Sequence, residues 1–125
     1  MMNAPTSAAR SHAWTLLKMS IEWQYLTARI AYMAKDNRDA IGSASVDFLQ
    51  YSGYVQMAKH WLMIELAAEK ALAAGSSEVD FYDAKRQTAD FYYKSMLPRT
   101  RGIVKSMITP PELLTNMREE QFGTP

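Results

Sequence analysis

The sequence contains no cysteine. This absence excludes disulfide bonds, thiolate nucleophiles, iron–sulfur ligation and covalent haem attachment. It also fits a reducing compartment. The start of the chain has no apolar stretch like that of a signal peptide, so we predict a cytoplasmic protein. The most apolar window, Trp61 to Ala68, contains Glu65 and is far shorter than the roughly 20 residues that cross a bilayer, so we expect no membrane span.

Excess charge, clustered glycine and metal-ligating patterns are also missing. The 14 basic and 13 acidic residues give a net charge of +1, so no field favours nucleic acid or an anionic membrane as partner. The five glycines are scattered and form no phosphate loop, which excludes Rossmann and P-loop nucleotide sites. The two histidines, His12 and His60, do not follow a glutamate at the Glu-x-x-His spacing of di-iron bundles. We predict no metal site and interpret His60 as a hydrogen-bonded or solvated side chain.

What the sequence does contain is helical periodicity over nearly its whole length. The apolar spacing predicts a first helix from Thr6 or Ser7 to about residue 35 and a second from an N-cap at Ser45 to about residue 74, with Gly75 just past its end. A third helix is expected over 79–107. The first helix is apolar around much of its circumference. Core packing explains most of these residues, and a residual apolar surface for association is the second interpretation.

The 125 residues are enough for one domain without disulfide or metal support. Short connections between long helices favour antiparallel neighbours. We therefore predict an all-α fold, an antiparallel up-and-down bundle of three long helices plus a short C-terminal helical turn, which oligomerisation could complete. The predicted organisation is a flexible N-terminus over 1–7, the helical bundle over 8–108, and a C-terminal tail with a short helical turn over 109–125.

Two residues are unusual for helix interiors. Glycine costs about 1 kcal/mol and proline about 3 kcal/mol relative to alanine there. Gly53 lies within the apolar stripe of the second helix, and we expect another helix to approach it closely. Pro98 interrupts the third helix, and we expect a kink rather than an end because the apolar pattern continues after it. With three large apolar residues, these positions form the predicted packing or interface set: Gly53, Trp61, Phe91, Tyr92 and Pro98.

Charged residues on the helices suggest two further sites. Lys94, Arg101 and Lys105 recur along one side of the third helix and are weak candidates for contacts with the phosphates of coenzyme A; a solvated face is the ordinary interpretation. Glu65 is the carboxylate on the apolar side of the second helix. No second group at useful spacing supports it as a catalytic base, so we expect it to snorkel or to pair with an Arg or Lys of a neighbouring helix. We predict no catalytic residue.

The chain, roughly from the first helix to Ile108, resembles the C-terminal helical extension of certain bacterial acyl-CoA dehydrogenases, including those that act on methylthiopropionyl-CoA-like substrates. The resemblance rests on residues 46–55, on Trp61 with the alanine-rich run to Gly75, on 89–92 with the sequence Ala-Asp-Phe-Tyr, and on 96–98 with the sequence Met-Leu-Pro. It implies a separate final module of a larger flavoprotein. The flavin-binding domain, acyl-CoA pocket and glutamate base of that family belong to other segments, so no catalytic or FAD-binding residue is carried over.

The resemblance implies a non-catalytic module that supports the assembly or the substrate entrance of a flavin-dependent acyl-CoA oxidation enzyme. Its partner would be the dehydrogenase body, in cis or in trans, and FAD would be bound by that body. A homo-oligomer is also expected. Two alternatives remain at this point, a stand-alone self-associating helical scaffold and a small bundle that binds coenzyme A.

Overall fold

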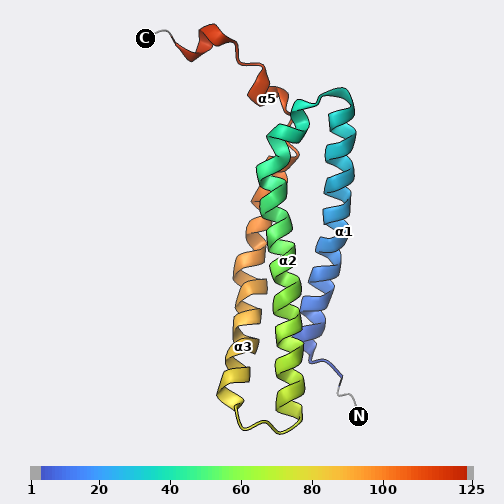
Figure 1. Cartoon of the computed structure of the whole chain (residues 1–125), viewed down its shortest axis with the longest axis vertical. Coiled ribbons are helices and arrows are strands. Elements are labelled where there is room, and N and C mark those ends of the chain that lie inside the picture. Colours follow the sequence, from blue (N-terminus) through green and yellow to red (C-terminus); the bar gives the residue numbers. More distant parts are fainter. Residues whose placement is uncertain (1–3, 124–125) are drawn as a thin grey trace.

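The computed structural model describes residues 4–123, which are almost entirely helical. Figure 1 shows three long rods side by side, and α2 packs against both of the others. Over the described range there is no strand, so the predicted all-α class and the three long helices are confirmed. The elements in chain order are α1 (Ser7–Asp36), α2 (Asp39–Ala73), α3 (Val79–Phe91), the π-helical turn η1 (Tyr92–Met96), the 3₁₀ turn η2 (Leu97–Arg99), α4 (Thr100–Met107), α5 (Glu112–Thr115) and the 3₁₀ turn η3 (Glu119–Phe122).

The N-terminus of α1 is capped by a side chain, as its sequence predicts. Thr6 Oγ1 accepts a hydrogen bond from the backbone N–H of Ala9, with an N···O distance of 3.2 Å, and its hydroxyl also donates to Glu69 of α2. The cap therefore fastens the start of α1 to the far part of α2. Of the segment 1–7 predicted to be flexible, residues 1–3 lie outside the described residues, and Thr6 and Ser7 form the cap and the first helical position.

The predicted start of α2 at Ser45 is wrong, because the helix begins at Asp39. Residues 40–44, which precede the predicted cap, are helical and lie against α1, where Ala40 and Ala44 are buried. The backbone N–H of Asp39 donates to Asn37 Oδ1 over 3.0 Å, so the asparagine supplies the local acceptor expected near a helix start. Packing of small side chains against a neighbouring helix thus outweighs the weak helix propensity of this stretch.

The end of α2 and the start of α3 at Val79 both follow the prediction. Gly75 has a φ of +82°, and its N–H donates to the carbonyl of Leu72 while that of Ser76 donates to the carbonyl of Ala71. This pair of bonds is the Schellman arrangement that favours glycine after a helix. α3 begins at Val79 without a side-chain cap.

The core lies between the three long helices and contains tyrosines as well as aliphatic residues. Leu26 of α1 and Tyr51 of α2 are fully buried at its centre. The buried core cluster consists of Met19, Leu26, Ala44, Tyr51, Val55, Ala58, Tyr92, Tyr93, Leu97 and Met107. No helix within residues 4–123 combines the length and the apolar character needed to cross a bilayer.

α1 has a second apolar face on the side away from the core. Large side chains recur along it at intervals of three, four or seven residues, which places them within a narrow stripe on the helix surface. Their exposed fractions lie between 48% and 71%: Trp14, Leu17, Ile21, Tyr25 and Tyr32. Tyr32 lies 18 positions after Trp14, so the stripe is about 27 Å long.

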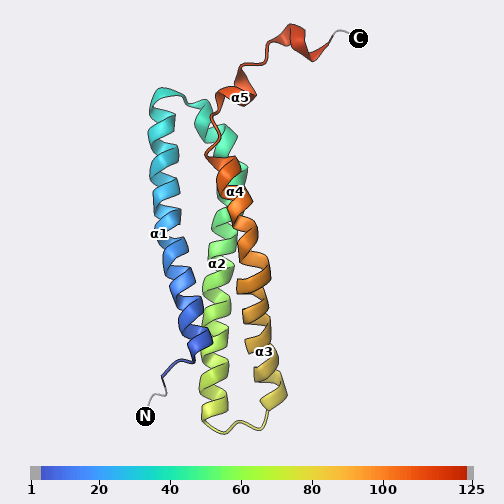
Figure 2. The same cartoon turned by 180° about the vertical axis from the view of Figure 1, so that it is seen from behind.

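The tail leaves the bundle at the end where α1 turns into α2. Pro111 is buried, and Asn37 Nδ2 donates to Glu112 Oε1 over 3.3 Å, which fixes the point of departure. Beyond it, α5 and η3 extend away from the rods in both views (Figures 1 and 2).

Candidate functional site

The helix that begins at Val79 departs from regular α-helical geometry around its proline, Pro98. Pro98 has no N–H and its ring would clash with a regular α-helical turn. The chain passes through the five-residue π turn η1 and then the 3₁₀ turn η2, and α4 continues beyond them. Continuation through Pro98 agrees with the sequence pattern, but the accommodation by two changes of helical type was not predicted. Such π segments are frequent at functional sites.

The π turn brings two neighbouring tyrosines into the bundle together. Tyr92 and Tyr93 are both buried, and their hydroxyls donate to the carbonyls of Tyr54 and Ala58 on α2, each over 2.7 Å. Burial raises the pKa of the Tyr92 phenol to about 12 and also raises the pKa of Tyr93. Both phenols are therefore neutral donors at ordinary pH, and the irregular segment is fastened to α2 at two carbonyls one helical turn apart.

A buried histidine joins the three long helices beside these tyrosines. His12 of α1 lies 2.8 Å from Glu65 Oε2 through Nδ1 and 3.2 Å from Asp90 Oδ1 through Nε2. Both contacts are hydrogen bonds when both ring nitrogens carry hydrogen. The ring also stacks on Tyr93, with centroids 4.3 Å apart and planes at 15°. Lys94 Nζ donates to Asp90 over 2.8 Å, and this contact lowers the pKa of that carboxyl.

The partner predicted for Glu65 was therefore wrong. The residue pairs with a histidine and not with an Arg or Lys. The sequence contains a signal for this pairing that was not recognised: His12 is four residues before Leu16 and seven before Met19, on the inner face of α1. His60 is exposed on α2.

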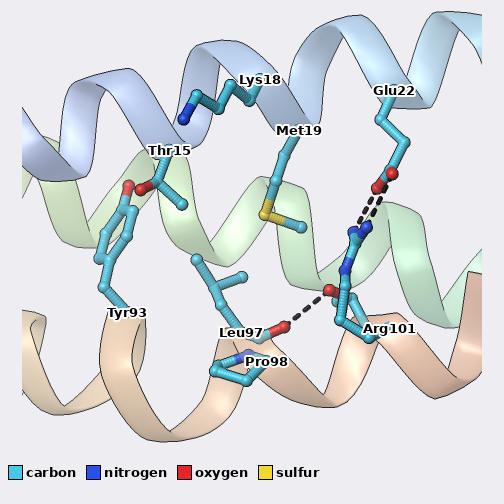
Figure 3. Close-up of a pocket in the computed structure, with 9 residues that line it drawn as sticks. Thr15, Lys18, Met19, Glu22, Tyr93, Leu97, Pro98 and Arg101 are labelled. Atoms are coloured by element: carbon cyan, nitrogen blue, oxygen red, sulfur yellow. Dashed lines mark hydrogen bonds and ion pairs between the residues drawn. The ribbon is translucent and has the colours of Figure 1, made fainter.

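A groove lies next to this cluster, between α1 and the irregular segment (Figure 3). Its volume is about 360 Å³. Tyr93 and Leu97 form the inner wall, where Thr100 Oγ1 also donates to the Leu97 carbonyl over 2.6 Å. The residues that line it are Thr15, Lys18, Met19 and Glu22 from α1, and Tyr93, Leu97, Pro98, Thr100 and Arg101 from the segment across from it.

An ion pair closes one end of the groove. Arg101 binds Glu22 through both terminal nitrogens, with a distance of 2.8 Å from Nη1 to Oε2. The hydrogen bond from Arg101 lowers the pKa of Glu22, against the opposing effect of burial, and the Glu22 carboxylate raises the pKa of Arg101. Tyr51 also donates to Glu22 Oε1 over 2.6 Å. The two charges thus neutralise each other. The other polar side chains that line the groove are Thr15, Lys18, Tyr93 and Thr100, and the three hydroxyl groups among them donate to backbone carbonyls.

Comparison with known protein families decides what this bundle is. The family model described as "Acetyl-CoA dehydrogenase C-terminal like" matches residues 1–118. The chain belongs to this family. A search of the curated proteins and a search of the solved structures each gave no significant match. The resemblance inferred from the sequence is therefore confirmed, and the match extends past Ile108 to include α5.

In this acetyl-CoA dehydrogenase C-terminal-like domain, the predicted interface residues lie in different environments. Tyr92 is buried and Trp61 is half-buried against the core. Pro98 lines the groove. Phe91 is 58% exposed, because the neighbouring tyrosines of the π turn take the inward positions. A Cβ on Gly53 would meet nothing within 4 Å, so the close approach expected there does not occur within the bundle. The role of these residues at an interface stays a prediction.

The three candidate anion contacts do not converge in the acetyl-CoA dehydrogenase C-terminal-like domain. Lys94 binds Asp90, and Arg101 binds Glu22 at the groove. Lys105 is exposed on α4 and does not line the groove. Among residues 4–123, no group of three His, Asp or Glu side chains is arranged to hold a metal ion.

The Glu22–Arg101 pair predicts an acid dependence of stability. A carboxylate whose pKa is lowered by folding stabilises the folded state above its unfolded pKa, and this contribution is lost as the pH falls through the folded value. We expect the unfolding free energy to decrease below pH 4.5, the ordinary value for this group. Arg101→Gln should remove part of that decrease. At neutral pH it should lower the free energy of unfolding by less than about 1 kcal/mol, because the pair is partly exposed. Urea unfolding at neutral and acidic pH measures both; equal acid sensitivity of wild type and variant would contradict the assignment.

Proposed function

We propose that the chain is a non-catalytic helical module that docks on the catalytic body of a flavin-dependent acyl-CoA dehydrogenase, in the same polypeptide or in a separate one. It supports assembly of that enzyme or borders its substrate entrance. FAD and the acyl-CoA are bound by the body. Membership of the acetyl-CoA dehydrogenase C-terminal-like family supports this context.

The observation that carries the proposal is the outer apolar stripe of α1, from Trp14 to Tyr32. A helix at the surface of a globular protein normally has one apolar face, toward the core, and a polar face toward water. α1 already buries Met19 and Leu26 on its inner face, so the stripe on the opposite side has no role within the bundle. Exposed contiguous apolar surface of this kind marks sites of protein association. The large aromatic residues in the stripe are suited to serve as anchors.

The polar groups of the groove fit a supporting role. Glu22 and Arg101 neutralise each other, and His12 is held between two carboxylates within the bundle. These side chains connect helices. They are engaged by partners of the same chain and so contribute to a fixed shape that can be presented to a larger protein.

Binding to the catalytic body of a flavin-dependent acyl-CoA dehydrogenase is the test. We expect a complex, and we expect Trp14→Glu with Ile21→Glu to weaken it by about 100-fold, because two anchors are lost and two charges are placed in the contact. Met57→Glu is the matched control, since Met57 is exposed to a similar degree on α2 and lies outside the stripe. Interferometry gives the affinities, and turnover and native mass of the dehydrogenase give the functional effect.

The proposal fails if the module neither binds the body nor alters its turnover or assembly. It also fails if the α2 control weakens binding as strongly as the stripe variant. Circular dichroism of each variant shows whether the bundle is intact, so a folding defect is recognised independently of binding.

A further inference from the structure

The C-terminal tail carries apolar side chains that are exposed, with no covering partner among residues 4–123. Leu113, Leu114, Met117 and Phe122 have exposed fractions between 54% and 73%. They lie on two short helical turns, α5 and η3, that extend away from the rods in both views (Figures 1 and 2). Four large apolar residues within ten positions form an apolar segment long enough to fill a groove on another surface.

A second groove, distinct from the one beside His12, lies between α1 and α2 near the end from which the tail departs. Its volume is about 580 Å³. Six apolar side chains line it: Ile30, Ala31, Ile41, Ala44, Phe48 and Leu49. The α1–α2 groove shares no residue with the outer stripe of α1.

The polar atoms of the α1–α2 groove are already satisfied by their own helices. Its three hydroxyl residues are Thr27, Ser45 and Ser52, and they donate to the carbonyls of Trp23, Gly42 and Phe48 over 2.7–2.9 Å. A polar ligand would find few free donors in this groove. The small side chains between Ile41 and Leu49 instead leave room for bulky aliphatic and aromatic groups, which is the chemistry of the tail.

We propose that the tail of one copy occupies the α1–α2 groove of a second copy. The tail cannot fill its own groove as it is placed, because the buried Pro111 and the hydrogen bond from Asn37 to Glu112 fix its departure and it runs outward from there. Both surfaces lie at the same end of the molecule, so two copies related by a two-fold axis exchange tails and close the contact. This inference does not rest on binding to a dehydrogenase body.

The absence of cysteine allows a direct test with engineered thiols. Asn116→Cys places one thiol between the apolar tail residues, and Ser45→Cys places another in the groove with little change in size. Chains with the single changes are mixed under mild oxidation. We expect a disulfide-linked species of twice the 14.2 kDa chain mass, containing one chain of each kind.

The control is Ser77→Cys, an equally small change in the exposed loop at the opposite end of the bundle. We expect Asn116→Cys to link to Ser45→Cys about 100-fold faster than to Ser77→Cys, because docking raises the effective thiol concentration. Adding Leu113→Glu and Leu114→Glu to the tail chain should remove this preference. If Asn116→Cys forms a disulfide with Ser45→Cys and with Ser77→Cys at equal rates, the proposal is overturned.

The doubly substituted chain, with Asn116→Cys and Ser45→Cys together, separates the two possible occupants. Linked dimers support exchange between copies. A monomer with a disulfide between its own two introduced thiols means that the tail folds into its own groove, and that result overturns the proposal. Native mass of the unmodified protein by light scattering provides the independent check, with a dimer expected and a monomer at all concentrations contradicting it.

Discussion

Replacement of Glu65 by alanine is expected to lower the free energy of unfolding by about 3–5 kcal/mol. Glu65 is almost fully buried and its Oε2 lies 2.8 Å from His12 Nδ1. Without it, the histidine keeps a buried polar nitrogen that has lost its acceptor, and a cavity is left on the inner face of α2. Both effects act in the same direction. Urea unfolding followed by circular dichroism at neutral pH measures the change.

A second variant separates the loss of the pair from the loss of volume. His12→Leu with Glu65→Leu removes both polar partners and retains apolar bulk, so it should recover about 2 kcal/mol or more relative to Glu65→Ala. Glu69→Ala is the matched control. It removes a glutamate one turn further along α2 that contacts Thr6 from a less buried position, and it should cost about 1 kcal/mol. Equal losses for Glu65→Ala and Glu69→Ala would contradict a central role for the histidine pair.

Truncation of Tyr51 to alanine should cost about 3–5 kcal/mol, since large buried aromatic rings fall in this range. Tyr51 is fully buried at the centre of the core. Its hydroxyl also donates to the Met19 carbonyl over 3.1 Å and to Glu22, which links α2 to α1 and, through Arg101, to α4.

Tyr51→Phe divides this loss into two parts. It keeps the ring and removes the hydroxyl, so it should cost about 1–2 kcal/mol. Double substitution with Arg101→Gln should cost less than the sum of the single changes, because the hydroxyl and the guanidinium meet the same carboxylate. Strict additivity in urea unfolding would show that the two contacts to Glu22 are independent.

The sequence alone predicts much of the fold because its long helices have strong local signals. Thr6 is a good N-cap and Gly75 has the positive φ that a helix end requires, so these boundaries were predicted correctly. The start of α2 was not, because Ala40 and Ala44 are held in the helix by contact with α1, and no local propensity reports that contact. Pro98 indicated that the helix would be irregular. The π turn itself was not predicted, because Tyr92 and Tyr93 donate to carbonyls of α2 that are distant in the sequence.

The site was harder to predict than the fold. His12 is separated from Glu65 by 53 residues and from Asp90 by 78, and only the packing of three helices brings them together. Gly53 gave a misleading signal, since its missing side chain faces open space and not a neighbouring helix of the same chain. Periodicity identified α1 as unusually apolar, and the structure shows that this surplus is an outward stripe.

The π turn η1 before Pro98 also sets the direction in which the side chains of α4 point around the helix axis. A regular α-helix advances about 100° per residue, so shortening 92–96 by one residue would swing α4 around its axis by roughly that angle. Arg101 would then point away from Glu22, and Met107 would leave the interior. The length of this segment is therefore under tight constraint: a one-residue deletion would disrupt the contacts of α4 with both α1 and α2.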